Sequence, residues 1–232
     1  MHAHREMSFA TARRHFLAKQ DGVGLETRQQ VVRRFDAIHK GLENAHTYSE
    51  FLYVAEAALH LKTPGPLVEC GCFRDGSTAK LSVLAELLDR PLYVCDSFAG
   101  LPTPDAHETE DRSWGTLERT WQPGEYTGRL EQVKANVAEY GCIDRCRFVE
   151  GFFAETLPEL AVAPALVYAD VDLVSSYADC VQHLWGTLEP GGFFFFHEAG
   201  LRKVVAGLLD AGFWREHFDR APPQLYGALF GM

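Results

Sequence analysis

The sequence lacks long hydrophobic runs and has little positive charge. No apolar stretch reaches the ~18 residues that a membrane-spanning helix needs, and the start, MHAHREMSFATARRHFLAKQ, lacks the apolar core of a signal peptide. We therefore expect a cytoplasmic protein without membrane contact. The 22 basic residues are outnumbered by 32 acidic ones, for a formal net charge of -10. This excess of negative charge does not favour the binding of a polyphosphate, so nucleic acid is not an expected partner.

We expect the cysteines to form neither a disulfide framework nor a metal-binding cluster. Cys70, Cys95 and Cys180 lie inside apolar periodic segments, where cysteine behaves as a small buried hydrophobe. Cys142 and Cys146 flank a turn, but no second pair follows at the spacing of a zinc finger. Repeats and low-complexity segments are also absent.

What the sequence does contain is a helical start followed by an alternating pattern. The helical periodicity up to about residue 62 predicts an extension (1–62) packed on a single globular domain (63–232). Five strand candidates then alternate with helical candidates at 77–88, 128–140 and 175–188, which predicts parallel strands joined by helical crossovers. The strand candidates are PLVECG, PLYVCD, CRFVEG, ALVYADVD and GFFFFHE.

The end of the chain breaks this rhythm. The stretch VVAGLLDAGFWREHFD predicts a helix with a strand-like tail, and PPQLYGALFGM adds another short apolar run with no helix between them. Two late strands joined by a short loop predict an antiparallel edge. The expected fold is therefore α/β, with a mostly parallel seven-stranded sheet, an antiparallel C-terminal edge and extra N-terminal helices.

The turn ECGCFRDGST follows the first strand candidate, where open parallel sheets bind ligands. Gly71 and Gly76 let the backbone approach a ligand, and the helix that starts near Ser77 offers unpaired amides to an anion. Glu69 suits an ammonium group better than a pyrophosphate, because a fixed carboxylate repels phosphate. A ligand with both charges is expected, and S-adenosylmethionine has them.

Two later strand ends extend this prediction. The second strand candidate ends in Asp96, at the distance along the chain where an acid typically meets a ribose in such folds. The third ends in FVEGFF, which places Glu150 and Gly151 near the adenine, with Phe152 able to pack on the ring.

One long irregular stretch, LPTPDAHETEDRSWGTLERTWQPGEYTG, lies between these strands. A loop of this length in a compact domain is usually a lid or a binding loop. Trp114, Trp121 and Tyr126 suit an aromatic or sugar-like surface. The alternative is a solvent-exposed loop that takes no part in binding.

These motifs in order, together with DSFAGLP, EGFFAETLP and DVDLVSSY, resemble the macrocin O-methyltransferase family over roughly residues 45 to 200. The resemblance implies a Rossmann-like class I methyltransferase that modifies sugar hydroxyls with S-adenosylmethionine. The positions that match its cofactor-contacting motifs are Glu69, Gly71, Gly76, Ser77, Asp96, Ser97, Glu150 and Gly151.

Asp170 and Asp172 interrupt an apolar strand at its end, and the two-residue period of a strand directs both to one side. Such a pair can hold a divalent cation, or one acid can hold it while the other takes a proton. The alternative is a purely structural role for this segment as the cap of the following helix, for which Ser175 is the better candidate. The resemblance implies Asp170 as a magnesium ligand and Asp172 as the base.

The next strand ends in His197 and Glu198, where the family typically presents two adjacent acids. Asp170 and Glu198 still offer oxygen ligands for magnesium, while His197 as a third ligand favours manganese, iron or zinc. Alternatively His197 is itself the base in a metal-free site, because its unperturbed pKa of about 6.5 suits proton removal near neutral pH.

The leading hypothesis is methyl transfer from S-adenosylmethionine to a hydroxyl of a small, glycosylated acceptor from natural-product biosynthesis. A second hypothesis is a non-catalytic S-adenosylmethionine-binding partner protein. A third is methyl transfer to an amine or carboxylate without metal. The sequence leaves a homodimer open.

Overall fold

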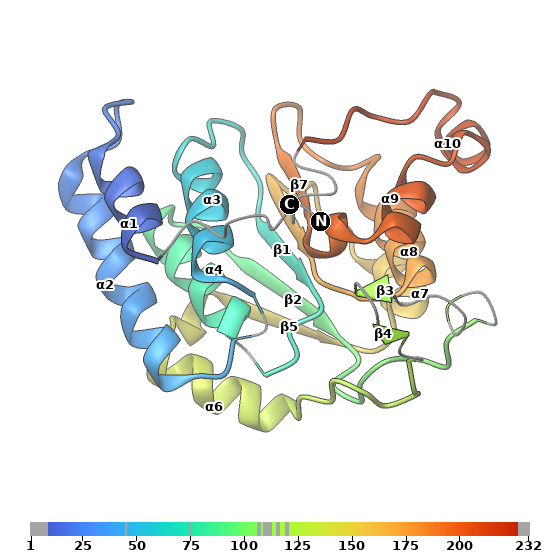
Figure 1. The fold of residues 1–232 in the computed structure, drawn as a ribbon, viewed down its shortest axis with the longest axis horizontal. Coiled ribbons are helices and arrows are strands. Elements are labelled where there is room, and N and C mark those ends of the chain that lie inside the picture. Colours follow the sequence, from blue (N-terminus) through green and yellow to red (C-terminus); the bar gives the residue numbers. More distant parts are fainter. Residues whose placement is uncertain are drawn as a thin grey trace.

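The computed structural model describes residues 9–44, 46–74, 76–105, 108, 113–114, 117–118 and 121–226. Helices and strands alternate after an all-helical start (Figure 1). The longer helices are α1 Phe9–Ala18, α2 Leu25–Gly41, α3 Tyr48–Leu59, α4 Gly76–Leu87, α6 Leu130–Tyr140, α8 Val174–Leu184, α9 Arg202–Leu208 and α10 Ala211–Phe218, with a single turn at α7 Phe153–Thr156. The strands are β1 Leu67–Cys70, β2 Leu92–Asp96, β3 Ser113–Trp114, β4 Leu117–Glu118, β5 Cys146–Glu150, β6 Leu166–Ala169 and β7 Phe193–Phe196.

Five strands form the main sheet, in the order β5-β2-β1-β6-β7. Every pair in it is parallel, which confirms the five predicted strands and the helical crossovers between them. The strand order reverses between β1 and β6, because the chain adds β2 and β5 on one side of β1 and β6 and β7 on the other. Ligands of such sheets bind beyond the carboxyl ends of the strands at this reversal.

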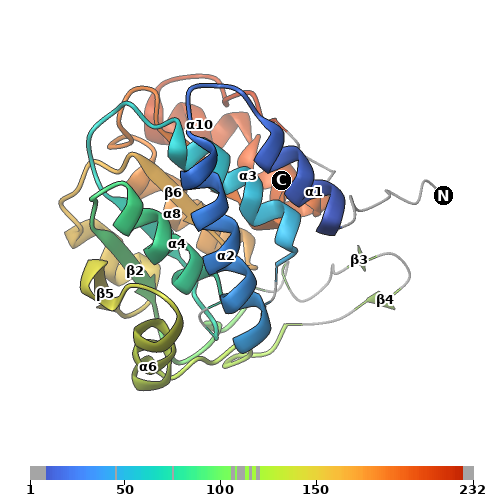
Figure 2. The ribbon, with the colours of Figure 1, turned by 90° about the vertical axis from the view of Figure 1, so that its left-hand side faces the viewer.

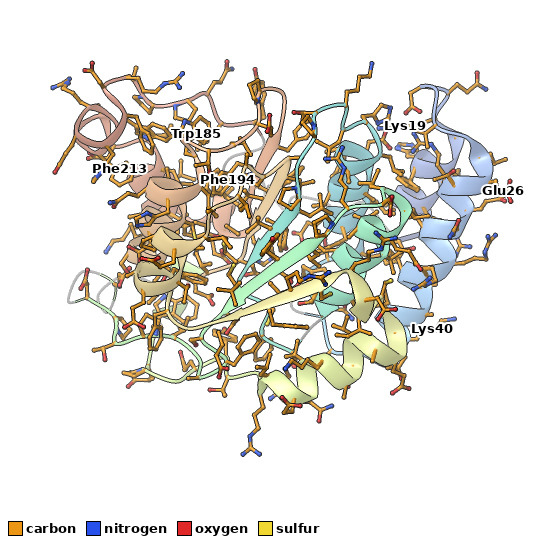
Figure 3. The ribbon with its side chains drawn as sticks, turned by 180° about the vertical axis from the view of Figure 1, so that it is seen from behind. Lys19, Glu26, Lys40, Trp185, Phe194 and Phe213 are labelled. Atoms are coloured by element: carbon orange, nitrogen blue, oxygen red, sulfur yellow. The ribbon has the colours of Figure 1, made fainter. Side chains whose placement is uncertain are left out.

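The two faces of the sheet bury separate cores. Leu67 of β1 joins the core beneath α1 to α4 and α6, whereas its neighbour Val68 joins the core beneath α8 to α10, as the two-residue period of a strand requires. Figure 2 shows α2, α3 and α4 together on the first side. On the second side Trp185 and Phe194 pack with ring centroids 6.2 Å apart, near Phe213 (Figure 3).

A buried arginine holds the N-terminal helices together. The Arg28 guanidinium of α2 donates to the Phe16 carbonyl at the end of α1, to Asp21 in the connecting loop and to Glu56 of α3. Its side chain has no exposed surface, so these partners offset the cost of burying the charge. The division into an extension (1–62) and a domain (63–232) stays a prediction.

The predicted strand-like tail is wrong. Residues 211–218 form α10, because Phe213, Trp214 and Phe218 have helical spacing and Asp210 caps the helix by accepting from the Phe213 amide. Trp214 is buried, and its indole N–H donates to the Leu208 carbonyl.

The described part of the main sheet therefore has five parallel strands, not seven with an antiparallel edge. The final apolar run is described only as far as Tyr226 and forms no strand up to there; residues 227–232 lie outside the described residues. None of the helices in the described part of the chain is both long and apolar enough to cross a membrane.

Candidate functional site

A cavity of about 390 Å³ lies beyond the carboxyl ends of the parallel strands. The turns after β1, β2, β5, β6 and β7 all contribute to its wall, so it occupies the point where the strand order reverses. Its lining consists of Gly71, Phe73, Asp96, Ser97, Gly100, Leu101, Pro102, Trp121, Tyr126, Phe152, Phe153, Asp170, Val171, Asp172, Ser176, His197, Glu198 and Leu201.

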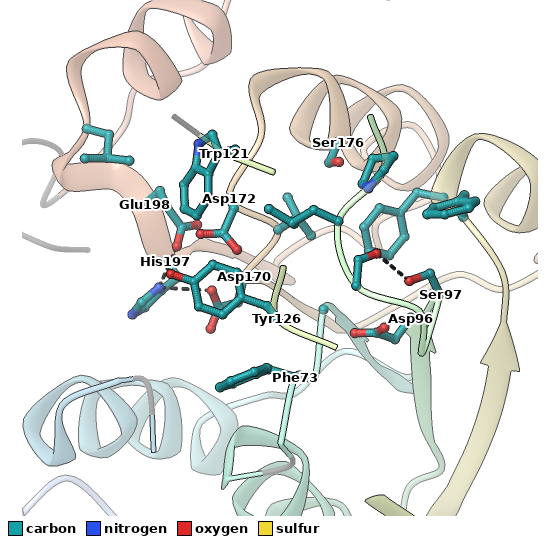
Figure 4. Close-up of a pocket in the computed structure, with 18 residues that line it drawn as sticks. Phe73, Asp96, Ser97, Trp121, Tyr126, Asp170, Asp172, Ser176, His197 and Glu198 are labelled. Atoms are coloured by element: carbon teal, nitrogen blue, oxygen red, sulfur yellow. Dashed lines mark hydrogen bonds and ion pairs between the residues drawn. The ribbon is translucent and has the colours of Figure 1, made fainter. Parts of the chain in front are cut away.

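Asp96 stands at one end of this cavity (Figure 4). Its carboxylate accepts from the Cys72 amide at 2.8 Å and from the Phe98 amide at 2.7 Å, so it fixes the turns after β1 and β2. Burial raises the pKa of Asp96, and these two backbone hydrogen bonds oppose the rise. Ser97 beside it donates to the Gly100 carbonyl at 2.7 Å.

The two predicted glycines of the first turn serve the protein's own packing. A Cβ on Gly71, which has φ +84°, would lie 2.0 Å from the Asp170 carbonyl oxygen. A Cβ on Gly76 would lie 2.7 Å from the Glu43 carbonyl oxygen. Gly71 lines the cavity and Gly76 does not. The glycine at 71 thus lets β1 and β6 bring their carboxyl ends close together.

Five of the predicted cofactor positions lie outside the cavity lining: Glu69, Gly76, Ser77, Glu150 and Gly151. Glu69 is fully buried on the sheet face towards α4, and neither carboxylate oxygen has a hydrogen-bond partner among the described residues. Burial raises the pKa of Glu69 to about 8 against the opposing effect of the nearby Ser77 and Thr78 hydroxyls, and the charges of Asp170 and Asp96 add to the rise. Burial therefore favours the neutral form of this side chain, and the assignment of Glu69 to the ammonium group of the cofactor stays a prediction.

At the other end of the cavity the four polar residues predicted after β6 and β7 come together (Figure 4). His197 Nδ1 lies 2.8 Å from Glu198 Oε1 and 3.1 Å from Asp170 Oδ1. One donor atom from each of these residues lies within 4.8 Å of the other two, so they could hold a metal ion together. Asp172 lines the same cavity.

The close packing of charged groups in this buried cluster sets their protonation. Burial alone lowers the pKa of His197, but the charge and hydrogen bonds of Asp170 and Glu198, with help from Glu50, outweigh burial and raise it. Burial and the charge of Asp170 raise the pKa of Glu198, against the effect of His197. In the absence of a cation the cluster therefore favours a positively charged imidazole.

Aromatic side chains cover the cavity beside this cluster. The Phe73 and Tyr126 rings meet edge to face with centroids 5.2 Å apart, and the Trp121 and Tyr126 centroids are 5.6 Å apart. Phe73 and Tyr126 both have left-handed backbones, with φ of +45° and +58°. Such backbones are costly for bulky residues and cluster at functional sites.

The predicted lid loop supplies part of this cover. Trp121 and Tyr126 line the cavity, and the ends of the loop are joined by hydrogen bonds from the Leu101 amide to the Glu125 carbonyl and from the Gly124 amide to the Leu101 carbonyl. The side chain of Trp114, and much of the loop around it, lies outside the described residues.

Ser175 does not cap α8 as the alternative reading of this segment predicted. The N-cap residue is Leu173, which makes no side-chain cap. Instead Glu108 of the loop accepts from the Ser175 amide at 2.7 Å and from its hydroxyl at 2.9 Å. A carboxylate at this position stabilises the N-terminus of a helix.

Sequence reasoning missed several residues of the site. Phe73 and Phe153 lie in motifs that were recognised, but nothing in the sequence indicated that their side chains face the cavity. Glu108 and Glu50 carry no local signal of a role here, because each reaches its partner from a distant part of the chain.

The model of the macrocin-O-methyltransferase (TylF) family matches residues 33–217. The 8-demethyl-8-(2,3-dimethoxy-alpha-L-rhamnosyl)-tetracenomycin-C 4'-O-methyltransferase of Streptomyces olivaceus is 38% identical over 148 residues, or 61% of this chain and 55% of that protein. The mycinamicin III 3''-O-methyltransferase of Micromonospora griseorubida is 30% identical over 151 residues, or 61% of this chain and 58% of that protein. The matches thus span little more than half the length of these relatives.

The solved structure of CalS11, a calicheamicin methyltransferase, superimposes with a TM-score of 0.58 at 18% identity. The superposition covers 90% of this chain and 94% of that one, and at this identity it shows the α/β methyltransferase fold alone. Membership follows from the family model, which matches well over half of the chain. The protein belongs to the macrocin-O-methyltransferase family.

Proposed function

We propose that this protein transfers a methyl group from S-adenosylmethionine to a hydroxyl of a small molecule, namely a sugar of a natural product. The observation that carries the proposal is one cavity lined by Asp96 and Ser97 at one end and by Asp170, Asp172 and Glu198 at the other. Family membership supports the reaction, and the rhamnosyl group in the name of the Streptomyces olivaceus relative supports a sugar as acceptor.

S-adenosylmethionine would be held by Gly71, Asp96, Ser97 and Phe152, which all line the cavity. This cofactor supplies an activated methyl group. The Asp96 carboxylate accepts from the Cys72 and Phe98 amides, and a ribose hydroxyl would be a further donor to it. Phe152, 38% exposed, has a ring face on which a base can pack.

A divalent cation would be held by Asp170, His197 and Glu198. The donor set fits such an ion, because three ligand atoms converge and two of them are carboxylate oxygens. A bound cation would supply positive charge that lowers the pKa of the acceptor hydroxyl.

Asp172 takes the hydroxyl proton in this proposal. Both ring nitrogens of His197 face carboxylates: Nδ1 faces Asp170 and Glu198, and Nε2 lies 3.8 Å from Glu50. This arrangement suits a histidine that holds a cation better than one that removes a proton. The left-handed backbone of Asp172, with φ +62°, is one that aspartate tolerates.

The test is to incubate the purified protein with S-adenosylmethionine and a panel of glycosylated metabolites, with manganese, with magnesium and with excess chelator. Mass spectrometry should find an acceptor that gains one methyl group only when a cation is present. Full turnover in chelator would favour the metal-free base. Tight cofactor binding with no methylated product across the panel would favour the non-catalytic partner protein.

A further inference from the structure

One side chain of the N-terminal helices, that of Glu50, contacts the candidate cation site. Glu50 is in the first turn of α3, where its Oε2 accepts from the Thr47 amide at 2.6 Å as half of a capping box. The same oxygen lies 3.8 Å from His197 Nε2. The Glu50 and His197 side chains are only 18% and 15% exposed, so little water competes at this contact.

The opposite side of the imidazole faces the candidate ligands. Nδ1 lies next to Asp170 and Glu198, and the Tyr177 hydroxyl donates to the second oxygen of Glu198. Tyr177 is itself buried, which holds Glu198 in place. The ring of His197 is thus oriented from both sides, with Nδ1 towards the cluster and Nε2 towards Glu50.

Metal-binding histidines have a related arrangement, although the Glu50–His197 distance of 3.8 Å is longer than a hydrogen bond. A ligating histidine usually donates its second ring N–H to a carboxylate, which fixes the orientation of the ring and increases its basicity. Magnesium prefers oxygen ligands, whereas imidazole suits transition metals, so one nitrogen among the protein ligands changes the preferred cation.

We propose that Glu50 positions His197 as a nitrogen ligand and that the site thereby selects manganese or a similar transition metal over magnesium. The N-terminal helices then form part of the cation site and do more than cover the sheet. The presence of a cation rests on the proposed function, but the test below needs neither cofactor nor acceptor, so its failure is separate from a failure to find methyl transfer.

The test measures binding of Mn²⁺ and Mg²⁺ to the purified full-length protein by calorimetry. The wild type should bind Mn²⁺ more tightly than Mg²⁺, and pulsed electron paramagnetic resonance of bound Mn²⁺ should show coupling to an imidazole nitrogen. The His197→Asp variant should lose that coupling and show a smaller preference for Mn²⁺ over Mg²⁺. Glu50→Gln should weaken Mn²⁺ binding at least about tenfold, as loss of such an outer partner usually does.

Thr47→Ala is the matched control. Glutamine at position 50 can keep its half of the capping box, whereas Thr47→Ala removes the side chain that accepts from the Glu50 amide and leaves the Glu50 carboxylate in place. Thr47→Ala should therefore lower the melting temperature and leave Mn²⁺ affinity unchanged.

Three results would overturn the proposal. One is a wild type that takes up no Mn²⁺ or prefers Mg²⁺. Another is bound Mn²⁺ without nitrogen coupling. The third is Glu50→Gln with wild-type affinity, or an equal loss of affinity in Thr47→Ala. The first two measurements need no Glu50 variant, so the proposal stays testable if Glu50→Gln fails to fold.

Discussion

Replacing Asp96 should damage both stability and cofactor binding, and the structure separates the two effects. Asp96→Ala removes the acceptor of the Cys72 and Phe98 amides. A hydrogen bond to a charged group contributes about 1.5–3 kcal/mol, so losing both should lower the free energy of unfolding by roughly 3 kcal/mol or more. Asp96→Asn keeps one acceptor oxygen and should lose about half as much.

Cofactor affinity gives the functional half of this prediction. If Asp96 accepts from a ribose hydroxyl, Asp96→Asn should weaken S-adenosylmethionine binding at least about tenfold, since 1.4 kcal/mol corresponds to that factor. Urea unfolding gives the stability and calorimetry gives the affinity.

Asp89→Asn is the control, because that aspartate precedes β2, is 87% exposed on its side chain and pairs only with Arg145 among the described residues. It should leave cofactor affinity unchanged. A folded Asp96→Asn protein with wild-type affinity would refute the assignment of Asp96 to the cofactor.

Three other predictions follow from the site. Asp172→Asn keeps a residue that tolerates the left-handed backbone, so it should leave the fold and cofactor affinity intact while turnover falls about a hundredfold or more; unchanged turnover would remove Asp172 as the base. Glu108→Gln removes the charge at the start of α8 and should cost about 1 kcal/mol while speeding hydrogen exchange of the Ser175 amide; exchange at the wild-type rate would contradict the contact. Glu69, whose pKa rises from 4.5 to about 8, stays protonated in the folded protein while the unfolded chain ionises, so its contribution to stability should fall as pH rises from about 4.5 to about 8. Urea unfolding across this range should show a flatter pH dependence for Glu69→Gln than for the wild type, and parallel curves would mean that Glu69 ionises normally.

The site residues at the carboxyl ends of the strands could be predicted from the geometry of a parallel sheet. Asp96, Asp170 and His197 lie at or near the carboxyl ends of three strand candidates, and parallel strands bring such positions to one edge of the sheet. The same reasoning does not tell which side chain faces the cavity once the chain leaves the strand. Glu69 shows this limit: it belongs to the motif, yet it is fully buried and does not line the cavity.

Contacts between distant segments could not be predicted from one sequence. Glu50 meets His197 only because α3 packs across β1 and β6, and Glu108 meets Ser175 across 67 positions of chain. The error at α10 has another cause. Short apolar runs fit strands and helices alike, and the helical spacing of Phe213, Trp214 and Phe218 decided the outcome once α8 offered a surface for them.

The most direct measurement of the proposed reaction uses S-adenosylmethionine that carries a ¹³C-labelled methyl group. After incubation of the protein with a glycosylated acceptor and a divalent cation, nuclear magnetic resonance identifies the atom that received the label. We predict a labelled methyl ether on a sugar oxygen, formed by the wild type and not by Asp172→Asn. Label on a nitrogen or in a carboxylate ester, or a sugar ether formed at the full rate in excess chelator, would contradict cation-assisted methylation of a sugar hydroxyl.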